Sequence, residues 1–465
     1  MRKNITVEIL ALVILIFLGI SGCGGSKSRD GSTGKSQSGQ NEVNPAAGTE
    51  QPATEPADKS ADKPAGKPAA TTTTAATPAK TEEPAQLEKV IFFIENSGSM
   101  FGYINQANEF KNSLVGIAYL PEFDRADKSF YFINGTSSPQ KKSAIQIKYQ
   151  GDDPEVFKNR LNPASFNVGD VRFSDLNRMF EIALDSAKGN QISVIVSDCL
   201  YDVGEETDPL TALKTEIQKT QQAFRTRLQN DNIQTLVIKA GSRFNGQYYY
   251  ASKKGSQKIQ NTDRPFYIIF FGKSALLNKA LTEQSIAGKI VGPHETARYF
   301  INDEKNIPFQ IVPSIDLKGE FKPDFKDKSK LTKARPLMGE FQFTFAVDFS
   351  SLPFSDSYYA ATGNYDCPYS NFSVVKVTRI TKKIPGVEGT HLITVFTDKN
   401  PLGDLQVVLK NVTPGWVIET HIDNEDAIDS THTFGFKSLM DAVSEAYDYV
   451  NHGMNPATFK IAITK

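Results

Sequence analysis

The sequence predicts an α/β doubly wound sheet followed by an antiparallel β-rich domain with one helix. In the first part, short continuous apolar runs, typical of strands buried on both faces, alternate with segments that have apolar residues at helical spacing. In the second part, apolar and polar residues alternate one by one, which is typical of half-buried strands. The chain has 31 Phe, 16 Tyr and 1 Trp, and all of them except Phe17 lie after residue 86. Both domains are therefore expected beyond that residue.

The first 22 residues have the pattern of an export signal. Arg2 and Lys3 precede an apolar run of 12 residues, Ile9 to Ile20, which is too short for a spanning helix of about 20 apolar residues. The residues Ile20-Ser21-Gly22-Cys23 come next and resemble the bacterial lipobox. The resemblance implies that residues 1–22 are a lipoprotein signal peptide and that a lipid on Cys23 anchors the chain in the bacterial cell envelope.

Two further points concern this leader. Gly24 follows the cysteine, whereas Asp at this position is linked with inner-membrane retention in enterobacteria, so the outer membrane is favoured. The alternative hypothesis is an ordinary signal peptide that happens to carry a cysteine.

Residues 23–86 differ in composition from everything that follows. They consist largely of Ser, Gly, Ala, Pro, Thr, Lys and Glu, and they contain no aromatic residue. Such a segment has too little apolar surface to form a core, so we expect it to be disordered. A flexible chain of this length spans roughly 45 Å root-mean-square at about 5–6 Å × √n. We interpret the segment as a tether between the membrane and the folded part.

Residues 87–287 are predicted to form the α/β sheet. The expected strands cover residues 89–94, 129–133, 144–149, 192–196, 233–238 and 265–271. The expected helices cover residues 105–117, 175–187, 209–228 and 276–281. The third of these helices has Asp208 placed as its cap and Pro209 at its first position. In a doubly wound sheet, ligands bind at the carboxyl ends of the strands.

Two of these strand ends carry candidate ligand-binding residues. Glu95, Ser97 and Ser99 directly follow the first strand, and Asp198 follows the fourth. Ser174 lies between them, before an expected helix. The arrangement resembles the von Willebrand factor A (integrin I-like) domain over roughly residues 88–285. The metal-ion-dependent adhesion site of that family has the pattern Asp-x-Ser-x-Ser after the first strand, a Thr from a later loop and an Asp after the fourth strand.

The resemblance implies a divalent metal site formed by Glu95, Ser97, Ser99, Ser174 and Asp198. Carboxylate and hydroxyl oxygens are hard ligands that suit Mg²⁺, Mn²⁺ or Ca²⁺, and a site with few charges leaves a position open for a partner's carboxylate. The sequence departs from the family pattern, because Glu95 replaces the first Asp, Ser174 stands where Thr is expected, and Cys199 stands where Gly is usual. The alternative is that the serines only cap the following helix.

Residues 288–465 are predicted to form the β-rich domain. Phe341, Phe343 and Phe345 alternate with polar or small residues. Further strands are expected at residues 374–380, 392–396, 405–409, 416–422 and 458–464. The one expected helix, residues 437–450, is predicted to pack against these strands, and the single tryptophan, Trp416, is expected in the core.

Composition excludes some classes of function. The chain has 52 basic and 53 acidic residues, so its global charge gives no support for nucleic-acid binding. Three cysteines are too few for a disulfide scaffold or a four-cysteine zinc site. The five histidines lack metal-ligand spacing, and the acidic stretch at residues 423–429 lacks the Gly and terminal Glu of a calcium loop, so we expect it to be a solvated loop.

Three classes of function are compatible with these observations. The first is a non-enzymatic envelope lipoprotein whose A-like domain binds a protein or envelope partner through a divalent ion. The second is a metal-dependent hydrolase of the phosphoester type, with Ser97 or Ser197 as nucleophile and Glu95 and Asp198 holding the metal. The third is a structural envelope protein with an inactive site.

Overall fold

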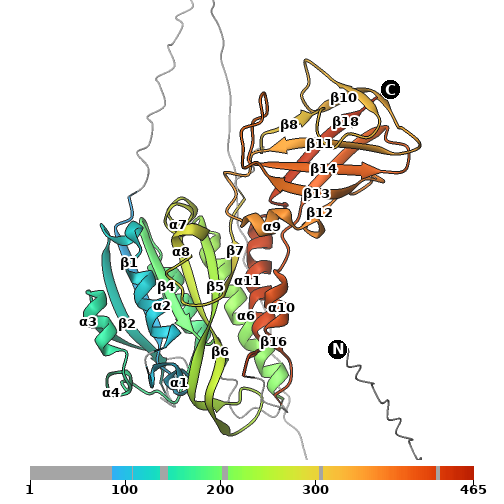
Figure 1. Ribbon diagram of the computed structural model, residues 1–465. Coiled ribbons are helices and arrows are strands. Elements are labelled where there is room, and N and C mark those ends of the chain that lie inside the picture. The colour runs from blue at the N-terminus through green and yellow to red at the C-terminus, as the bar shows by residue number, and fades with distance from the viewer. Residues whose placement is uncertain (1–85, 107, 137–144, 202–207, 303–306, 426–429) are drawn as a thin grey trace, which may run out of the picture. The chain divides into compact units, whose positions relative to one another are not determined.

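The computed structural model describes residues 86–465, apart from residues 107, 137–144, 202–207, 303–306 and 426–429. The proposed signal peptide, Cys23 and residues 23–85 of the proposed tether lie outside the described residues. The first part of the described chain is built on a seven-stranded sheet (Figure 1). Its strands are β1 (Lys89–Glu95), β2 (Asp127–Gly135), β3 (Ile145–Gly151), β4 (Gln191–Ser197), β5 (Ile233–Tyr249), β6 (Ser256–Lys273) and β7 (His294–Tyr299).

The strands follow the order β3-β2-β1-β4-β6-β5-β7, and the sheet is mixed rather than parallel throughout. Strand β1 is parallel to both β2 and β4, as expected for the centre of an α/β sheet. The other pairs, β2 with β3, β4 with β6, β6 with β5 and β5 with β7, are antiparallel. Strands β5 and β6 form one long hairpin, and a short connection can join only antiparallel neighbours. The apolar runs of both strands resemble those of a parallel sheet because both faces are buried.

Helices cover both faces of this sheet. The helical segments of this part of the chain are η1 (Gly98–Met100), α1 (Phe101–Ile104), α2 (Glu109–Ala118), η2 (Pro121–Phe123), α3 (Pro154–Arg160), α4 (Pro163–Phe166), α5 (Leu176–Ser186), α6 (Pro209–Leu228), α7 (Ser274–Ala280) and α8 (Glu283–Ile286). Phe110 of α2 contacts Phe266, whereas Phe180 of α5 contacts Phe271. Phe266 and Phe271 lie five residues apart on β6 and so point to opposite faces.

Sequence signals at the helix ends account for where these helices begin. Helix α6 spans the predicted residues, and the Asp208 side chain accepts a hydrogen bond from Leu210 N at its start. Helix α2 begins four residues later than predicted, because Asn108 caps it by accepting a hydrogen bond from Lys111 N at 3.2 Å. The chain before Asn108 instead forms the short segments η1 and α1 directly after β1.

The second part of the described chain is rich in antiparallel strands and has its own core. A five-stranded sheet has the order β12-β15-β18-β10-β9, and a four-stranded sheet has the order β13-β14-β11-β8. Their elements are β8 (Phe309–Val312), β9 (Glu320–Pro323), β10 (Lys330–Arg335), β11 (Phe341–Val347), α9 (Asp356–Ala360), η3 (Thr362–Asn364), β12 (Tyr365–Asp366), β13 (Ser373–Arg379), β14 (His391–Thr397), β15 (Gly403–Leu409) and β18 (Ala457–Ile463). Phe345 of one sheet packs with Phe459 of the other in a shared core.

The predicted strand at residues 416–422 is wrong. The segment forms helix α10 (Gly415–Glu419), followed by the short strands β16 (His421–Ile422) and β17 (Thr433–Phe434). Pro414 is the N-cap residue of this helix. Thr420 is the C-cap residue, and its hydroxyl donates a hydrogen bond to Trp416 O at 2.6 Å. Trp416 is buried, as predicted, but it belongs to the core of the seven-stranded sheet.

The expected packing of the C-terminal helix on the β-rich domain is also wrong. Helix α11 (Phe436–Val450) packs against α6 and the first sheet. Phe436 stacks on Tyr267 of β6 with ring centroids 4.0 Å apart. Tyr447 Oη lies 2.8 Å from Thr235 Oγ1 of β5. The helical spacing of apolar residues in α11 predicts a buried face, but it does not specify which of two apolar surfaces the helix covers.

We expect Phe436→Ala to destabilise the seven-stranded sheet by about 3–5 kcal/mol, because it removes a fully buried aromatic side chain. Trp416 is the only tryptophan and lies in the same core, so its fluorescence during urea unfolding reports on this part of the chain. The matched control is Phe325→Ala, since Phe325 is fully exposed. Equal unfolding midpoints for the two variants would contradict the assignment of α11 to this core.

Candidate ligand-binding site at the carboxyl edge of the sheet

The neighbouring strands β1 and β4 bring the first candidate residues together. The strands are parallel and in register, with Ile94 opposite Val196, so both end at the same edge. Glu95 is the last residue of β1, and Ser197 is the last of β4. The Ser197 hydroxyl donates to Glu95 Oε2 at 2.5 Å and accepts from Cys199 N at 2.7 Å. Glu95, Ser197 and Asp198 have no exposed surface.

Three further serines relate to this cluster in different ways. Ser97 and Ser174 lie close enough to Glu95 for their hydroxyls to lower the pKa of its carboxyl. Ser99 lies farther along the chain and meets the cluster through Ser97, with 3.1 Å between the two Oγ atoms. Ser97 occupies the N-cap position of η1, but its side chain makes no capping hydrogen bond. The alternative role of the serines as helix caps therefore lacks support.

Three hydrogen bonds hold the loop that carries Ser174 against the end of β1: two come from one side-chain amide and one from the main chain. Asn96 Nδ2 donates to Phe166 O and Val168 O at 2.9 and 2.8 Å. Gly98 N donates to Val171 O at 2.6 Å. These bonds fix the distance between the two loops, so the convergence of Ser174 with Glu95 is built into the fold.

Arg264 of β6 belongs to the site, although sequence analysis did not identify it. Its Nη2 atom lies 3.4 Å from Asp198 Oδ2, and its side chain is only 1% exposed. The guanidinium also lies over the rings of Tyr248 and Phe244. Burial of a charge is expensive unless it is paired, so this ion pair neutralises part of the site. One sequence signal could have identified Arg264, because it is a charged residue directly before the apolar run of a central strand.

The electrostatics of the site are dominated by Glu95. Burial, with a smaller effect from the nearby Asp198 charge, raises the pKa of its carboxyl to about 7, although the hydrogen bond from Ser197 and the nearby hydroxyls of Ser174 and Ser97 oppose this rise. Two oxygens of the site, Glu95 Oε1 and Ser174 Oγ, are buried and have no hydrogen-bond partner among the described residues. Buried polar atoms are rarely left without a partner, so these two oxygens are candidates for ligand contacts.

The end of the β5–β6 hairpin covers this edge of the sheet. Two glycines permit its close approach: a Cβ on Gly246 would lie 2.6 Å from Gly102 Cα, and one on Gly102 would lie 2.2 Å from the Phe244 ring. Tyr103 Oη donates to Pro265 O at 2.5 Å and ties α1 to β6. The hairpin therefore shields the buried charges from water.

The hairpin is itself fastened by Glu425. This residue is buried and accepts hydrogen bonds from Tyr248 Oη and from both the main-chain and side-chain groups of Ser252. The expectation of a solvated loop at residues 423–429 is therefore wrong at Glu425. Residues 426–429 lie outside the described residues.

A pocket of about 490 Å³ opens beside the buried cluster. It adjoins η1, so the Ser97–Ser99 segment separates it from Glu95. Its walls come from η1, α1, the loop before α5 and the hairpin, and they include Gly98, Phe101, Asn105, Val171, Gln247 and Tyr249. None of the five candidate residues lines the pocket, so it lies next to the cluster and does not contain it.

Cys199 follows Asp198 in a left-handed backbone conformation, with φ 55°. Glycine adopts this conformation without strain, whereas other residues adopt it rarely. A glycine would therefore fit this position with less strain than the cysteine that occupies it. Cys199 and Cys367 are both free and buried.

The described residues contain no group of three or more His, Cys, Asp or Glu side chains that could hold a metal ion. A site of the adhesion type instead needs carboxylates and hydroxyls. The free oxygens of Glu95 and Ser174 fit a hard divalent ion, with Ser97 and Ser99 alongside. Asp198 is already paired with Arg264, which neutralises its charge, so Asp198 is a less available ligand than Glu95.

No protein-family model matches the chain, and no curated protein matches it significantly. None of the helices in the described part of the chain is long and apolar enough to cross a membrane.

We expect Arg264→Met to destabilise the protein by about 3–5 kcal/mol, because it leaves the buried Asp198 carboxylate unpaired. The double variant Arg264→Met/Asp198→Asn should recover much of this loss, and urea unfolding measures both. The matched control is Arg243→Met on the same hairpin, where the pair with Asp263 is exposed and is expected to contribute less than about 1 kcal/mol. Equal losses for Arg264→Met and Arg243→Met would contradict the buried pair.

The raised pKa of Glu95 predicts that stability depends on pH. The folded protein retains the Glu95 proton up to about pH 7, whereas the unfolded chain releases it near pH 4.5. The free energy of unfolding should therefore fall by about 3 kcal/mol as pH rises between these values, in chelator-treated buffer. Glu95→Gln should remove this component. The hypothesis is wrong if the stability difference between wild type and Glu95→Gln stays constant from pH 4 to pH 8.

Proposed function

We propose that the chain is a lipid-anchored lipoprotein of the bacterial cell envelope whose von Willebrand factor A-like domain binds a protein or envelope partner. The proposed binding site is the carboxyl edge of the seven-stranded sheet. The observation that carries the proposal is the convergence of Glu95, Ser97, Ser174 and Asp198 beside a pocket of about 490 Å³. These residues come from three separate segments, and they meet where ligands bind in α/β sheets.

Features of both the fold and the site support the A-like assignment. Strands β2, β1 and β4 form a parallel centre, and helices cover both faces. The candidate residues follow β1 and β4, which are the positions that the family resemblance implies. The left-handed Cys199 after Asp198 agrees with a position where the family pattern has Gly.

A divalent ion is part of the proposal. Mg²⁺, Mn²⁺ or Ca²⁺ would be held by Glu95, Ser97, Ser99 and Ser174, with Asp198 nearby and paired with Arg264. When bound, the ion supplies an open coordination position for a carboxylate of the partner. Glu95 and Asp198 have no exposed surface, so the partner's carboxylate would approach the ion past Gly98 and Ser99, which are partly exposed.

The anchor belongs to the same proposal and rests on the lipobox at Ile20 to Cys23. A lipid on Cys23 would hold the mature chain at a membrane, with the outer membrane favoured. Residues 23–86 would then allow the binding site to reach partners some tens of ångströms from the bilayer.

The hydrolase hypothesis has less support. The Ser197 hydroxyl is fully buried and already engaged, as donor to Glu95 and as acceptor from Cys199 N. Ser97 is 5% exposed. A nucleophile must reach its substrate, and neither hydroxyl is open to solvent in this arrangement.

Site-specific photo-crosslinking in cells tests the proposed binding edge. A photoreactive amino acid replaces Gln247, which is exposed on the pocket wall, in the otherwise unchanged full-length chain. We expect one adduct of defined mass, because the partner covers this edge. The matched control replaces Gln222, an exposed glutamine on α6, and should give no such adduct.

A second variant links the adduct to the candidate site. Adding Ser99→Ala to the Gln247 variant should remove most of the adduct, because the substitution alters the site but replaces a small, partly exposed side chain. Equal adducts at Gln247 and Gln222, or an adduct that Ser99→Ala leaves unchanged, would contradict binding at this edge.

A further inference from the structure

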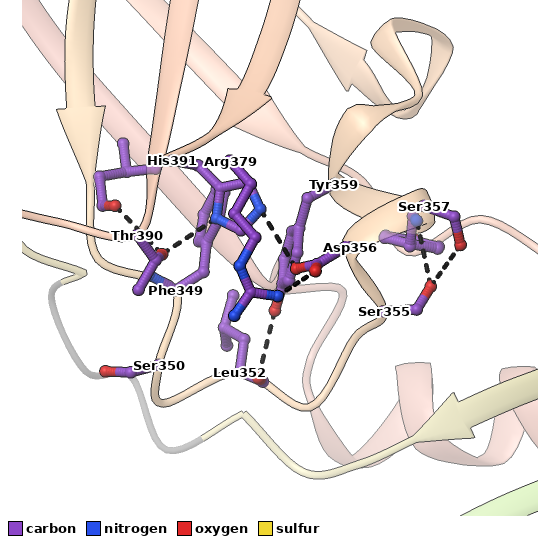
Figure 2. Close-up of polar contacts among 12 residues, drawn as sticks. Phe349, Ser350, Leu352, Ser355, Asp356, Ser357, Tyr359, Arg379, Thr390 and His391 are labelled. Carbon is purple, nitrogen blue, oxygen red and sulfur yellow. Dashed lines mark hydrogen bonds and ion pairs between the residues drawn. The ribbon is translucent and has the colours of Figure 1, made fainter. Parts of the chain in front are cut away.

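A second pocket, of about 440 Å³, lies away from the carboxyl edge. One side is formed by α7, α8 and β7 of the first sheet. The other side is formed by residues 349–356, Tyr359 and the facing ends of β13 and β14, which carry Arg379 and His391. Figure 2 shows Arg379 and His391 both directed toward Asp356 at the start of α9. The pocket therefore combines charged groups from both parts of the described chain.

Three buried polar atoms around this pocket have no hydrogen-bond partner among the described residues. They are Arg298 Nη1, His391 Nε2 and Asn278 Oδ1. A buried polar atom without a partner costs about 1–3 kcal/mol, and native structures contain few such atoms. Asn278 Oδ1 is an acceptor and would need a donor, whereas Arg298 Nη1 is a donor, so Arg298 is the group of the three that an anion can satisfy.

Arg298 carries the strongest signal of the three. Its Nη2 atom donates to Leu281 O, but the guanidinium forms no ion pair within the described part of the chain. Burial lowers the pKa of Arg298 to about 10, and the charge of Glu283 only partly opposes this effect. A buried guanidinium without a counter-charge destabilises the folded protein, so an anion bound in the pocket would stabilise it.

Of the two acidic residues that line the pocket, Glu283 only partly offsets the burial of Arg298 and forms no ion pair with it among the described residues, and Asp356 is engaged with other groups. Asp356 forms an ion pair with Arg379, and its Oδ1 atom lies 3.6 Å from His391 Nε2 (Figure 2). Burial lowers the pKa of His391, so its imidazole is neutral at pH 7. Its Nδ1 atom lies 3.0 Å from Thr390 Oγ1, which leaves Nε2 as the atom without a hydrogen-bond partner.

We propose that this pocket binds an oxyanion, the carboxylate or phosphate group of a small ligand, with Arg298 as its principal contact. The fork of N–H donors in a guanidinium matches the paired oxygens of these groups. The hydroxyls of Thr282, Ser350 and Ser355 line the same pocket and add donors. A pocket of this size accommodates a small ligand that carries the anionic group.

Thermal unfolding of the purified mature chain tests the proposal with two probes, inorganic phosphate and succinate, against chloride at equal ionic strength. We expect at least one probe to raise the melting temperature by a few degrees in a saturable way. Stabilisation by phosphate alone identifies a phosphorylated ligand, and stabilisation by succinate alone identifies a carboxylate. If neither probe exceeds chloride, the proposal is overturned.

The variant Arg298→Met assigns the effect to this pocket. Without anion it should be at least as stable as wild type, because it removes a buried charge that has no partner, and it should lose the response to the probe. Arg178→Met, on the exposed face of α5, is the control and should keep the response. A retained response in Arg298→Met would overturn the proposal. A large loss of stability in this variant without anion would also overturn it, because the charge would then be compensated by the chain itself.

Discussion

The buried ion pair between Asp198 and Arg264 is the interaction on which the carboxyl edge of the first sheet depends. Both side chains are almost completely excluded from solvent, so neither could remain charged at reasonable cost without the other. Glu95 lies beside this pair, and burial together with the Asp198 charge raises the pKa of its carboxyl to about 7. A positive charge next to this carboxyl would favour its ionised form.

The antiparallel half of the sheet provides the means to bury this pair. Strand β6 carries Arg264 to the end of β4, and the hairpin it forms with β5 folds over the edge. The contact between Gly102 and Gly246 brings the hairpin close to α1, and Glu425 holds its tip. The mixed topology of the sheet, the buried cation and the covered site thus arise from one structural element.

Much of the fold could be predicted from sequence, because apolar runs and helix caps are local signals. Strands β1, β2 and β4 and helix α6 follow such signals. The site residues after β1 and β4 could be found because parallel strands end together. Features that depend on contacts between distant segments could not be predicted from local sequence patterns. They are the direction of β6, the core that α11 joins, and the pairing of Arg264 with Asp198.

Anomalous diffraction from crystals of the mature chain grown with millimolar Mn²⁺ tests the central claim most directly. The account predicts an anomalous peak within coordination distance of Glu95 Oε1 and Ser174 Oγ, two buried oxygens without a hydrogen-bond partner among the described residues. Density for the Arg264 side chain should remain against Asp198. The absence of any peak at the ends of β1 and β4, with Glu95 and Ser174 hydrogen-bonded only to each other or to water, would contradict the account.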